Sequence, residues 1–193
     1  KWDTSEVREM AWMFAGCIKF YQNIAMWDTS NVIRMEGMFE GAVRFNQPLN
    51  DWDVSNVRYM LRMFDGAKSF NQPLDRWNVS RVEDAERMFK NARSFSQSLD
   101  MWLIPRFCDI SNMFLYAPKF TDVKTLTLCF HLATKKNCRA RLKEKLDKLH
   151  PAEVYTELSR YGSEHTAEYM RELEAAHPEL IGSVRTNVGD VKC

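Results

Sequence analysis

Polar residues that could carry chemistry recur in this sequence at a fixed spacing. The amides return at Gln22, Gln47, Gln72, Gln97, Asn46 and Asn71, and a second row contains Asp3, Asp28, Asp53 and Asn78. The amides could form a polar active site, and the row of carboxylates could bind calcium. Stacked identical amides more often pair with backbone groups of neighbouring repeats, and no ligand loop rich in glycine and aspartate accompanies the second row. We therefore expect an amide ladder, and local hydrogen bonds from the aspartates into the following turn.

Other residue combinations give little support to catalysis or to metal binding. The four histidines form no HExxH motif, and the five cysteines are scattered without a CxxC pair. No Ser/His/Asp order or phosphate-binding glycine loop stands out. We therefore expect no enzymatic activity, no metal and no cofactor. The odd number of cysteines favours reduced thiols and therefore an intracellular protein. The alternative is a protein at the cell surface or a secreted one.

The composition excludes some classes of partner. A net charge of +1 argues against a general nucleic-acid or membrane-surface binder. No apolar run approaches the roughly 18 residues that a membrane span needs. The chain begins at Lys1 within a repeat, so we expect a processed chain or part of a longer one. Its 193 residues suffice for one domain with an appendage.

A 25-residue repeat organises the first two thirds of the chain. Tryptophan recurs without insertion at Trp2, Trp27, Trp52, Trp77 and Trp102, and Met-Phe pairs follow from Met13-Phe14 to Met113-Phe114. Around Trp52 the residues alternate as in a short strand with one buried face. After Ser55, a plausible N-cap, apolar residues return at steps of three and four, which predicts one or two helical turns. The column Gly16, Gly41, Gly66, Asn91 predicts a left-handed end to each turn, and Tyr116 departs from it.

The repeats resemble a known family. The segment WDVSNVRYMLRMFDGAKSFNQPL is similar to the 25-residue repeat of BspA-like, DUF285 proteins, which are mycoplasma lipoproteins and bacterial surface proteins. This resemblance covers about residues 1–120 and implies a leucine-rich-repeat-like solenoid without catalytic residues, used in binding and surface display. We accordingly expect an α/β repeat solenoid of five coils with a short parallel sheet over residues 1–122. Leu103-Ile104-Pro105 departs from the pattern in the fifth coil.

Residues 123–193 have no counterpart in the repeat. Their spacing predicts a basic helix over 135–148, a second helix from Pro151 to Gly162 and a third from Ser163 towards Pro178. We expect these helices to cap the last coil, and residues 183–193 to form a flexible tail. The basic helix pairs most simply with the two acidic helices that follow it. The alternative, functional hypothesis is that this helix contacts an acidic partner or RNA through Lys135, Lys136, Arg139 and Arg141.

The positions that vary between repeats are the candidates for function. The outward face of the predicted helical turns contains residues of the types favoured in protein contacts. The alternative explanation is that these positions show ordinary surface variation. These candidates are Trp12, Ile33, Arg58, Arg62 and Arg87. We predict a non-enzymatic protein-interaction module or scaffold subunit, with partners at the open first coil and on this outer face. The alternatives are a secreted or cell-surface adhesin and, less favoured, an RNA-contacting subunit.

Overall fold

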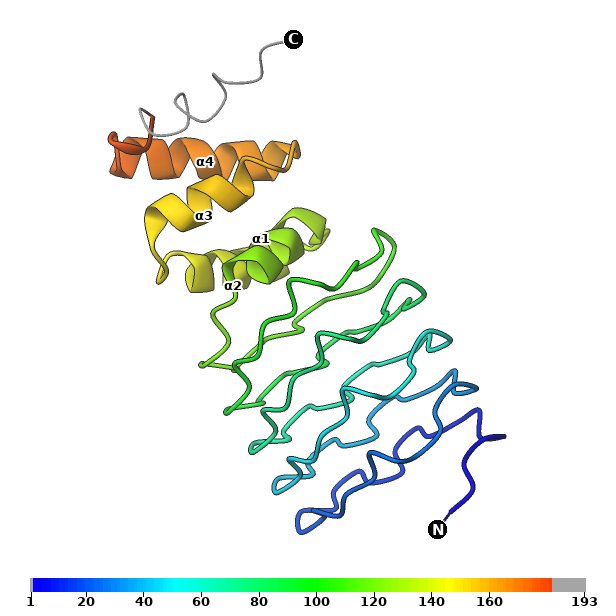
Figure 1. Ribbon diagram of the computed structural model, residues 1–193. Helices are drawn as coiled ribbons and strands as arrows, with labels where there is room; N and C mark the ends of the chain where they lie inside the picture. Colours follow the sequence, from blue (N-terminus) through cyan, green and yellow to red (C-terminus); the bar gives the residue numbers. More distant parts are fainter. Residues whose placement is uncertain (1, 182–193) are drawn as a thin grey trace. The chain divides into compact units, whose positions relative to one another are not determined.

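The computed structural model describes residues 2–181 and divides the chain into two units, 1–122 and 123–193 (Figure 1). The first unit contains the repeats, which follow one another as similar loops of chain. The second contains α1 (Val123–Leu132), α2 (Lys136–Leu146), α3 (Pro151–Leu158) and α4 (Glu164–Ala176). The capping of the last repeat by the helices stays a prediction. The tail predicted for 183–193 lies outside the described residues.

The predicted α/β solenoid fold with a parallel sheet is wrong. Within residues 2–122 the chain forms turns, and its only sheet-like pairings are isolated parallel bridges that join Glu9, Arg34, Tyr59, Asp84 and Asp109 in succession. The segment expected to be a strand is a turn, because Trp52 N–H donates to the carbonyl of Leu49 at 3.1 Å. The bridge instead falls at Tyr59, inside the segment expected to be helical.

The hydrogen bonding explains why no helix forms after Ser55. Met60 and Phe64 donate their N–H groups to carbonyls of the next repeat at 2.7 and 2.8 Å, and Met63 donates back to Met60 at 3.1 Å. Alternate amides therefore join repeats instead of closing helical turns. In addition, Arg62 and Gly66 both have positive φ, 55° and 72°, and two left-handed residues four apart interrupt any α-helix. The left-handed conformation predicted for Gly16, Gly41, Gly66 and Asn91 is confirmed, but it ends no helix. Tyr116, expected to depart from this column, has φ 58° and is left-handed too.

Apolar columns hold neighbouring repeats together. Phe39, Phe64 and Phe89 are fully buried and stack with ring centroids 5.5 Å apart at both steps. The tryptophans contribute a hydrogen bond as well as area, since Trp77 Nε1 donates to the carbonyl of Leu49 at 2.9 Å. Burying such rings is the main driving force for folding, and the hydrogen bond removes the cost of burying the indole N–H.

The fifth repeat slips by one residue. Val82 N–H bonds to the carbonyl of Val79 at 3.0 Å, and the matching bond in the fifth repeat runs from Cys108 to Pro105, also at 3.0 Å. Cys108 therefore occupies the buried place of the valine column and is 8% exposed, whereas Phe107 is 70% exposed. The bridge between Asp84 and Asp109 restores the register. The departure at Leu103-Ile104-Pro105 thus places a phenylalanine on the surface.

The helices of the second unit begin where the sequence signals predicted. Pro151 is the first residue of α3, and Ser163 is the N-cap residue of α4. Their apolar faces are buried, with Val154 and Leu158 on α3 and Leu173 on α4. The basic stretch starts one residue before α2, since Lys135 is the N-cap residue of that helix.

Candidate functional site

The aspartate row is used locally, as predicted. Ser30 N–H donates to Asp28 Oδ1 at 3.0 Å, and Ser55 N–H donates to Asp53 Oδ1 at 2.9 Å. The bonds from the Ser30 hydroxyl and amide hold the pKa of Asp28 below its ordinary value. Among residues 2–181, no group of three or more His, Cys, Asp or Glu side chains is placed to hold a metal ion. The row is therefore a set of turn-forming carboxylates.

The amide ladder is present between the second and fourth repeats. Gln72 Nε2 donates to the backbone carbonyl and to Oδ1 of Asn46, both at 3.2 Å. Gln97 repeats this arrangement on Asn71 at 3.3 and 3.1 Å. Because these amides bond to one another across repeats, they hold the repeats together.

None of the predicted contact residues lies on a helix: Trp12, Arg62 and Arg87 lie on turns, and Ile33 and Arg58 directly precede bridge residues. Trp12 is 47% exposed, Arg58 is exposed, and Ile33, Arg62 and Arg87 are half-buried. The indole of Trp12 covers Gly37, because a β-carbon there would overlap Cε3 and Cζ3 of the ring. We call the side chains of Trp12, Ile33, Arg34, Arg58, Tyr59, Arg62 and Arg87 the bridge face.

A chain of polar contacts connects part of this face. Glu83 accepts from Arg58 Nη1 at 3.1 Å and from the Tyr59 hydroxyl at 3.3 Å. The guanidinium carbon of Arg34 lies 5.0 Å from the centroid of the Tyr59 ring. The Arg34 guanidinium also forms an ion pair with Glu36. Arg34 and Tyr59 were not among the contact residues predicted from the sequence. Their column reads Glu9, Arg34, Tyr59, Asp84, Asp109, and this variation was the signal that could have identified them.

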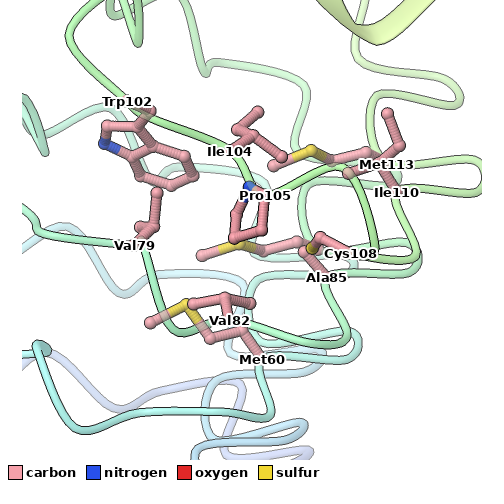
Figure 2. Close-up of a pocket in the computed structure, with 11 residues that line it drawn as sticks. Met60, Val79, Val82, Ala85, Trp102, Ile104, Pro105, Cys108, Ile110 and Met113 are labelled. Carbon is pink, nitrogen blue, oxygen red and sulfur yellow. The ribbon is translucent and has the colours of Figure 1, made fainter. Parts of the chain in front are cut away.

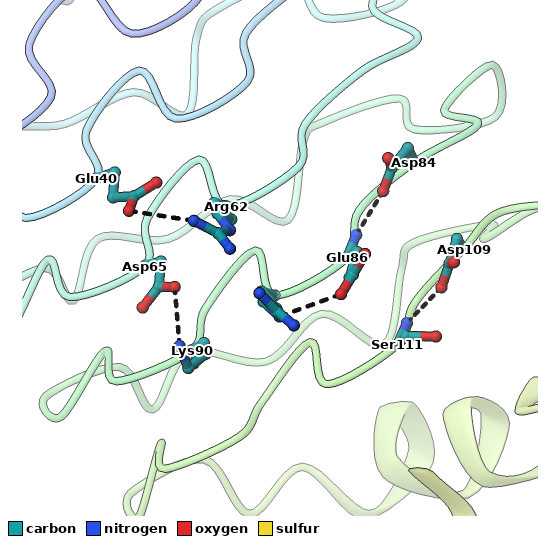
Figure 3. Close-up of polar contacts among 9 residues, drawn as sticks. Glu40, Arg62, Asp65, Asp84, Glu86, Lys90, Asp109 and Ser111 are labelled. Carbon is teal, nitrogen blue, oxygen red and sulfur yellow. Dashed lines mark hydrogen bonds and ion pairs between the residues drawn. The ribbon is translucent and has the colours of Figure 1, made fainter. Parts of the chain in front are cut away.

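The two remaining arginines of the bridge face form looser or more local ion pairs. Arg62 Nη1 lies 3.6 Å from Glu40 Oε1, and Arg87 Nε lies 3.1 Å from Glu86 Oε1. Figure 3 shows the first of these beside the parallel pair of Lys90 and Asp65. Since exposed ion pairs contribute at most about 1 kcal/mol, these contacts alone give little reason for arginine at these positions.

Backbone strain marks the same column. Trp12, Arg62, Arg87 and Asn112 have φ between 55° and 61°, and Gly37 in the second repeat has φ 55°. A left-handed backbone costs a residue with a β-carbon about 1–2 kcal/mol, whereas glycine adopts it freely. The second repeat demonstrates that glycine suffices for the fold at this position. Bulky side chains are held there against a conformational cost.

Some side chains of the basic segment bond to other residues of the second unit. Arg139 Nη1 donates to the carbonyls of Ala133 and Thr134 at 2.9 and 3.2 Å. Lys135, Lys136 and Arg141 are exposed. The predicted pairing with the acidic helices is found at Lys143, whose ammonium lies 3.1 Å from Glu172 of α4.

A histidine and serine cluster joins the end of α1 to the start of α4. Ser163 Oγ lies 3.0 Å from His131 Nδ1 and 2.6 Å from Thr166 Oγ1. His165 Nε2 lies 3.0 and 3.1 Å from the carbonyls of Phe130 and His131. Carbonyls only accept, so this nitrogen donates and caps the C-terminal end of α1. No motif in the sequence indicated the cluster, because its members are brought together only by helix packing.

An apolar hollow lies where the fifth repeat departs from the pattern (Figure 2). Its walls include Val79, Val82, Trp102, Ile104 and Cys108. Burial raises the pKa of the Cys108 thiol to about 12, with Asp84 and Asp109 adding to the effect. A thiol that stays protonated is a poor nucleophile.

The stacked 25-residue unit defines a repeat protein, in which the amide column bonds to neighbouring repeats and the aspartate column bonds within its own turns. The family described as "Mycoplasma protein of unknown function, DUF285" matches residues 1–102 and, in a second alignment, residues 49–127. The chain belongs to this family, as the sequence predicted. Neither a curated protein nor a solved structure matches the chain. No helix in residues 2–181 is long and apolar enough to cross a membrane.

Proposed function

We propose that residues 2–122 form a non-enzymatic protein-binding module and that the partner is bound by the bridge face. Trp, Tyr and Arg are the residue types that contribute most often to binding hot spots. The bridge face contains all three, at Trp12, Tyr59 and its arginines. The aspartate column forms local turns and the amide column holds the repeats together, which leaves the varied columns for recognition.

The observation that carries the proposal is the left-handed backbone of Trp12, Arg62 and Arg87, at 61°, 55° and 58°. Strained backbone tends to accumulate at functional sites, because the surrounding structure holds it at the expense of stability. Glycine would adopt this conformation without strain, as Gly37 does in the second repeat. Binding through the side chains explains why they are present despite the strain.

The test replaces Arg62 and Arg87 by glycine together. Because glycine removes the strain, the double variant should unfold at the same temperature as the wild type or higher. We expect it to lose most of the capture of specific proteins from lysate of the source organism, quantified by mass spectrometry. A matched control exchanges two exposed cations elsewhere, Lys68→Ala with Arg76→Ala, and should capture the same proteins as the wild type.

Either of two results would contradict the proposal. A folded R62G/R87G variant with an unchanged set of captured proteins would show that the bridge face binds nothing. A marked fall in its unfolding temperature would show that the arginines are retained for stability. Surface display as an adhesin and RNA contact through the basic segment stay predictions.

A further inference from the structure

A row of exposed cations crosses the five repeats. In each repeat, one of the two residues before the last phenylalanine of the repeat is lysine or arginine. These residues, which we call the cation row, are all exposed: Lys19, Arg44, Lys68, Arg93 and Lys119. None of them forms an ion pair with another described residue, whereas Arg58, Arg62 and Arg87 of the bridge face each lie against a glutamate.

The segment that contains the cation row has no acid of its own. The six residues that read GAKSFN in the third repeat include no aspartate or glutamate in any of the five repeats. The acids directly before this segment, Glu40 and Asp65, already lie 3.6 and 3.4 Å from Arg62 and Lys90 (Figure 3). Asp122, just after it in the fifth repeat, accepts hydrogen bonds from the fourth repeat. The row is therefore a strip of uncompensated positive charge.

The stacking of the repeats spaces these cations. The adjacent phenylalanine rings, from Phe20 to Phe120, have centroids between 5.6 and 6.1 Å apart from one repeat to the next. Backbone bonds join the same turns, since Ser69 N–H donates to the carbonyl of Val43 at 3.1 Å, and the next two repeats are joined in the same way at 3.2 Å. Like charges one repeat apart repel one another, and a bound anion relieves this repulsion.

From this arrangement we propose that the cation row binds an extended acidic segment of a protein, with carboxylates at every second residue. Alternate side chains of an extended chain point to the same side and recur at about 6.6–6.8 Å, twice the rise per residue. This spacing is close to that of the phenylalanine rings, and the flexible stems of lysine and arginine accommodate the difference. The cation row lies on a different part of the repeat from the bridge face, so this inference goes beyond the proposed function.

A peptide fits the cation row better than single-stranded nucleic acid does. Proteins that bind single strands combine cations with aromatic side chains on which successive bases stack. The residues that follow the phenylalanine rings offer such a ring in the first repeat alone: they are Tyr21, Asn46, Asn71, Ser96 and Thr121. Carboxylates need only the charge-assisted hydrogen bonds that ammonium and guanidinium groups donate.

The test titrates the full chain into a fluorescein-labelled peptide of five Glu-Ser units at low ionic strength and follows the fluorescence anisotropy. We expect saturable binding that weakens as salt is added, because salt screens exposed charges. A peptide of five serines followed by five glutamates has the same composition. It should bind more weakly, because alternate glutamates in its acidic half point away from the row.

Two triple variants locate the binding surface. The first removes the middle of the row with Arg44→Gln, Lys68→Gln and Arg93→Gln, and should weaken binding about tenfold, the combined loss of three exposed ion pairs. The matched control removes the same charge from exposed positions outside the row, with Arg76→Gln, Arg81→Gln and Arg106→Gln. It should weaken binding by less than about twofold. Thermal unfolding shows that both variants are folded, and relief of repulsion should leave the first at least as stable as the wild type.

Several results would overturn the inference. An absence of saturable binding, equal binding of the two peptides, or equal losses in the two triple variants would each show that the row is not a site. Tighter binding of a single-stranded oligothymidylate with the same number of charges would assign the row to nucleic acid instead.

The proposed function fails separately from this inference. Excess Glu-Ser peptide in the capture experiment blocks the cation row alone, so capture that persists with the peptide and is lost in R62G/R87G belongs to the bridge face. The control used there, Lys68→Ala with Arg76→Ala, keeps four of the five cations of the row. Peptide binding with unchanged capture by R62G/R87G would remove the proposed function and leave this inference standing.

Discussion

The indole of Trp12 in the first repeat lies directly over the α-carbon of Gly37 in the second. Gly37 is buried and has φ 55°, and the Trp12 ring fills the space that a side chain would need, so glycine is required there for space. Trp12 also belongs to the strained column of the bridge face. One pair of residues thus links the stacking of the repeats to the proposed contact surface.

Gly37→Ala should destabilise the protein more than Gly16→Ala does. Both glycines have positive φ, 55° and 71°, so either alanine costs about 1 kcal/mol of strain. At Gly16 a β-carbon meets no atom within 4 Å, whereas at Gly37 it overlaps the Trp12 ring. We expect an additional loss of about 1–3 kcal/mol for Gly37→Ala in urea unfolding. Equal losses for the two variants would show that the ring moves aside without cost.

Tyr116→Gly should raise stability by up to about 1 kcal/mol, because Tyr116 has φ 58° and glycine relieves the left-handed strain. Its side chain is 66% exposed, so little packing is lost. The matched control is Tyr21→Gly. Tyr21 is similarly exposed, 60%, and its backbone is not left-handed, so its replacement should lower stability. Differential scanning calorimetry measures both, and a fall for Tyr116→Gly would refute the strain.

Gln72→Ala should lower the free energy of unfolding by about 0.5–1.5 kcal/mol and leave the bridge face intact. The variant removes the two 3.2 Å bonds to Asn46 that join neighbouring repeats. Gln22 is exposed, and no rung of the ladder is found for it among the described residues, so Gln22→Ala serves as the control and should have no effect. An unchanged unfolding temperature for Gln72→Ala would refute a structural role for the ladder.

Cys108 should make stability depend on pH in the alkaline range. Its folded pKa of about 12 lies above the ordinary value of 9.0, so the unfolded chain loses the thiol proton first. The contribution of this thiol is fully present below pH 9 and is lost as pH rises towards 12, with a slope of at most about 1.4 kcal/mol per pH unit.

Cys108→Val is the control for this effect, since Cys108 occupies the place of the valine column. Other groups titrate in the same range, so the informative quantity is the difference between the wild type and the variant in urea unfolding at pH 8 and pH 10. We expect the wild type to lose more stability over this interval. Parallel losses would show that the thiol is accessible to water in the folded protein.

Several features of the fold and the candidate site could be predicted from residue types alone. The period of 25, the local role of Asp28 and Asp53, and the left-handed glycine column all follow from side-chain chemistry and conformational preference. The first residues of the two helices, near Pro151 and Ser163, could be predicted for the same reason. The prediction of a sheet and helical turns was wrong, because apolar spacing records which residues are buried and not the partner of each backbone amide.

By itself, the sequence determined the repeat, its buried columns and the family to which the chain belongs. Only the tertiary structure decided that the amides after Ser55 bond to the next repeat, that Phe107 is displaced to the surface and that Trp12 covers Gly37. The physical reason is the separation of the partners along the sequence. The residue types that favour turns and burial can be recognised within a few residues, whereas these pairings join positions about 25 residues apart. They depend on how one repeat stacks on the next.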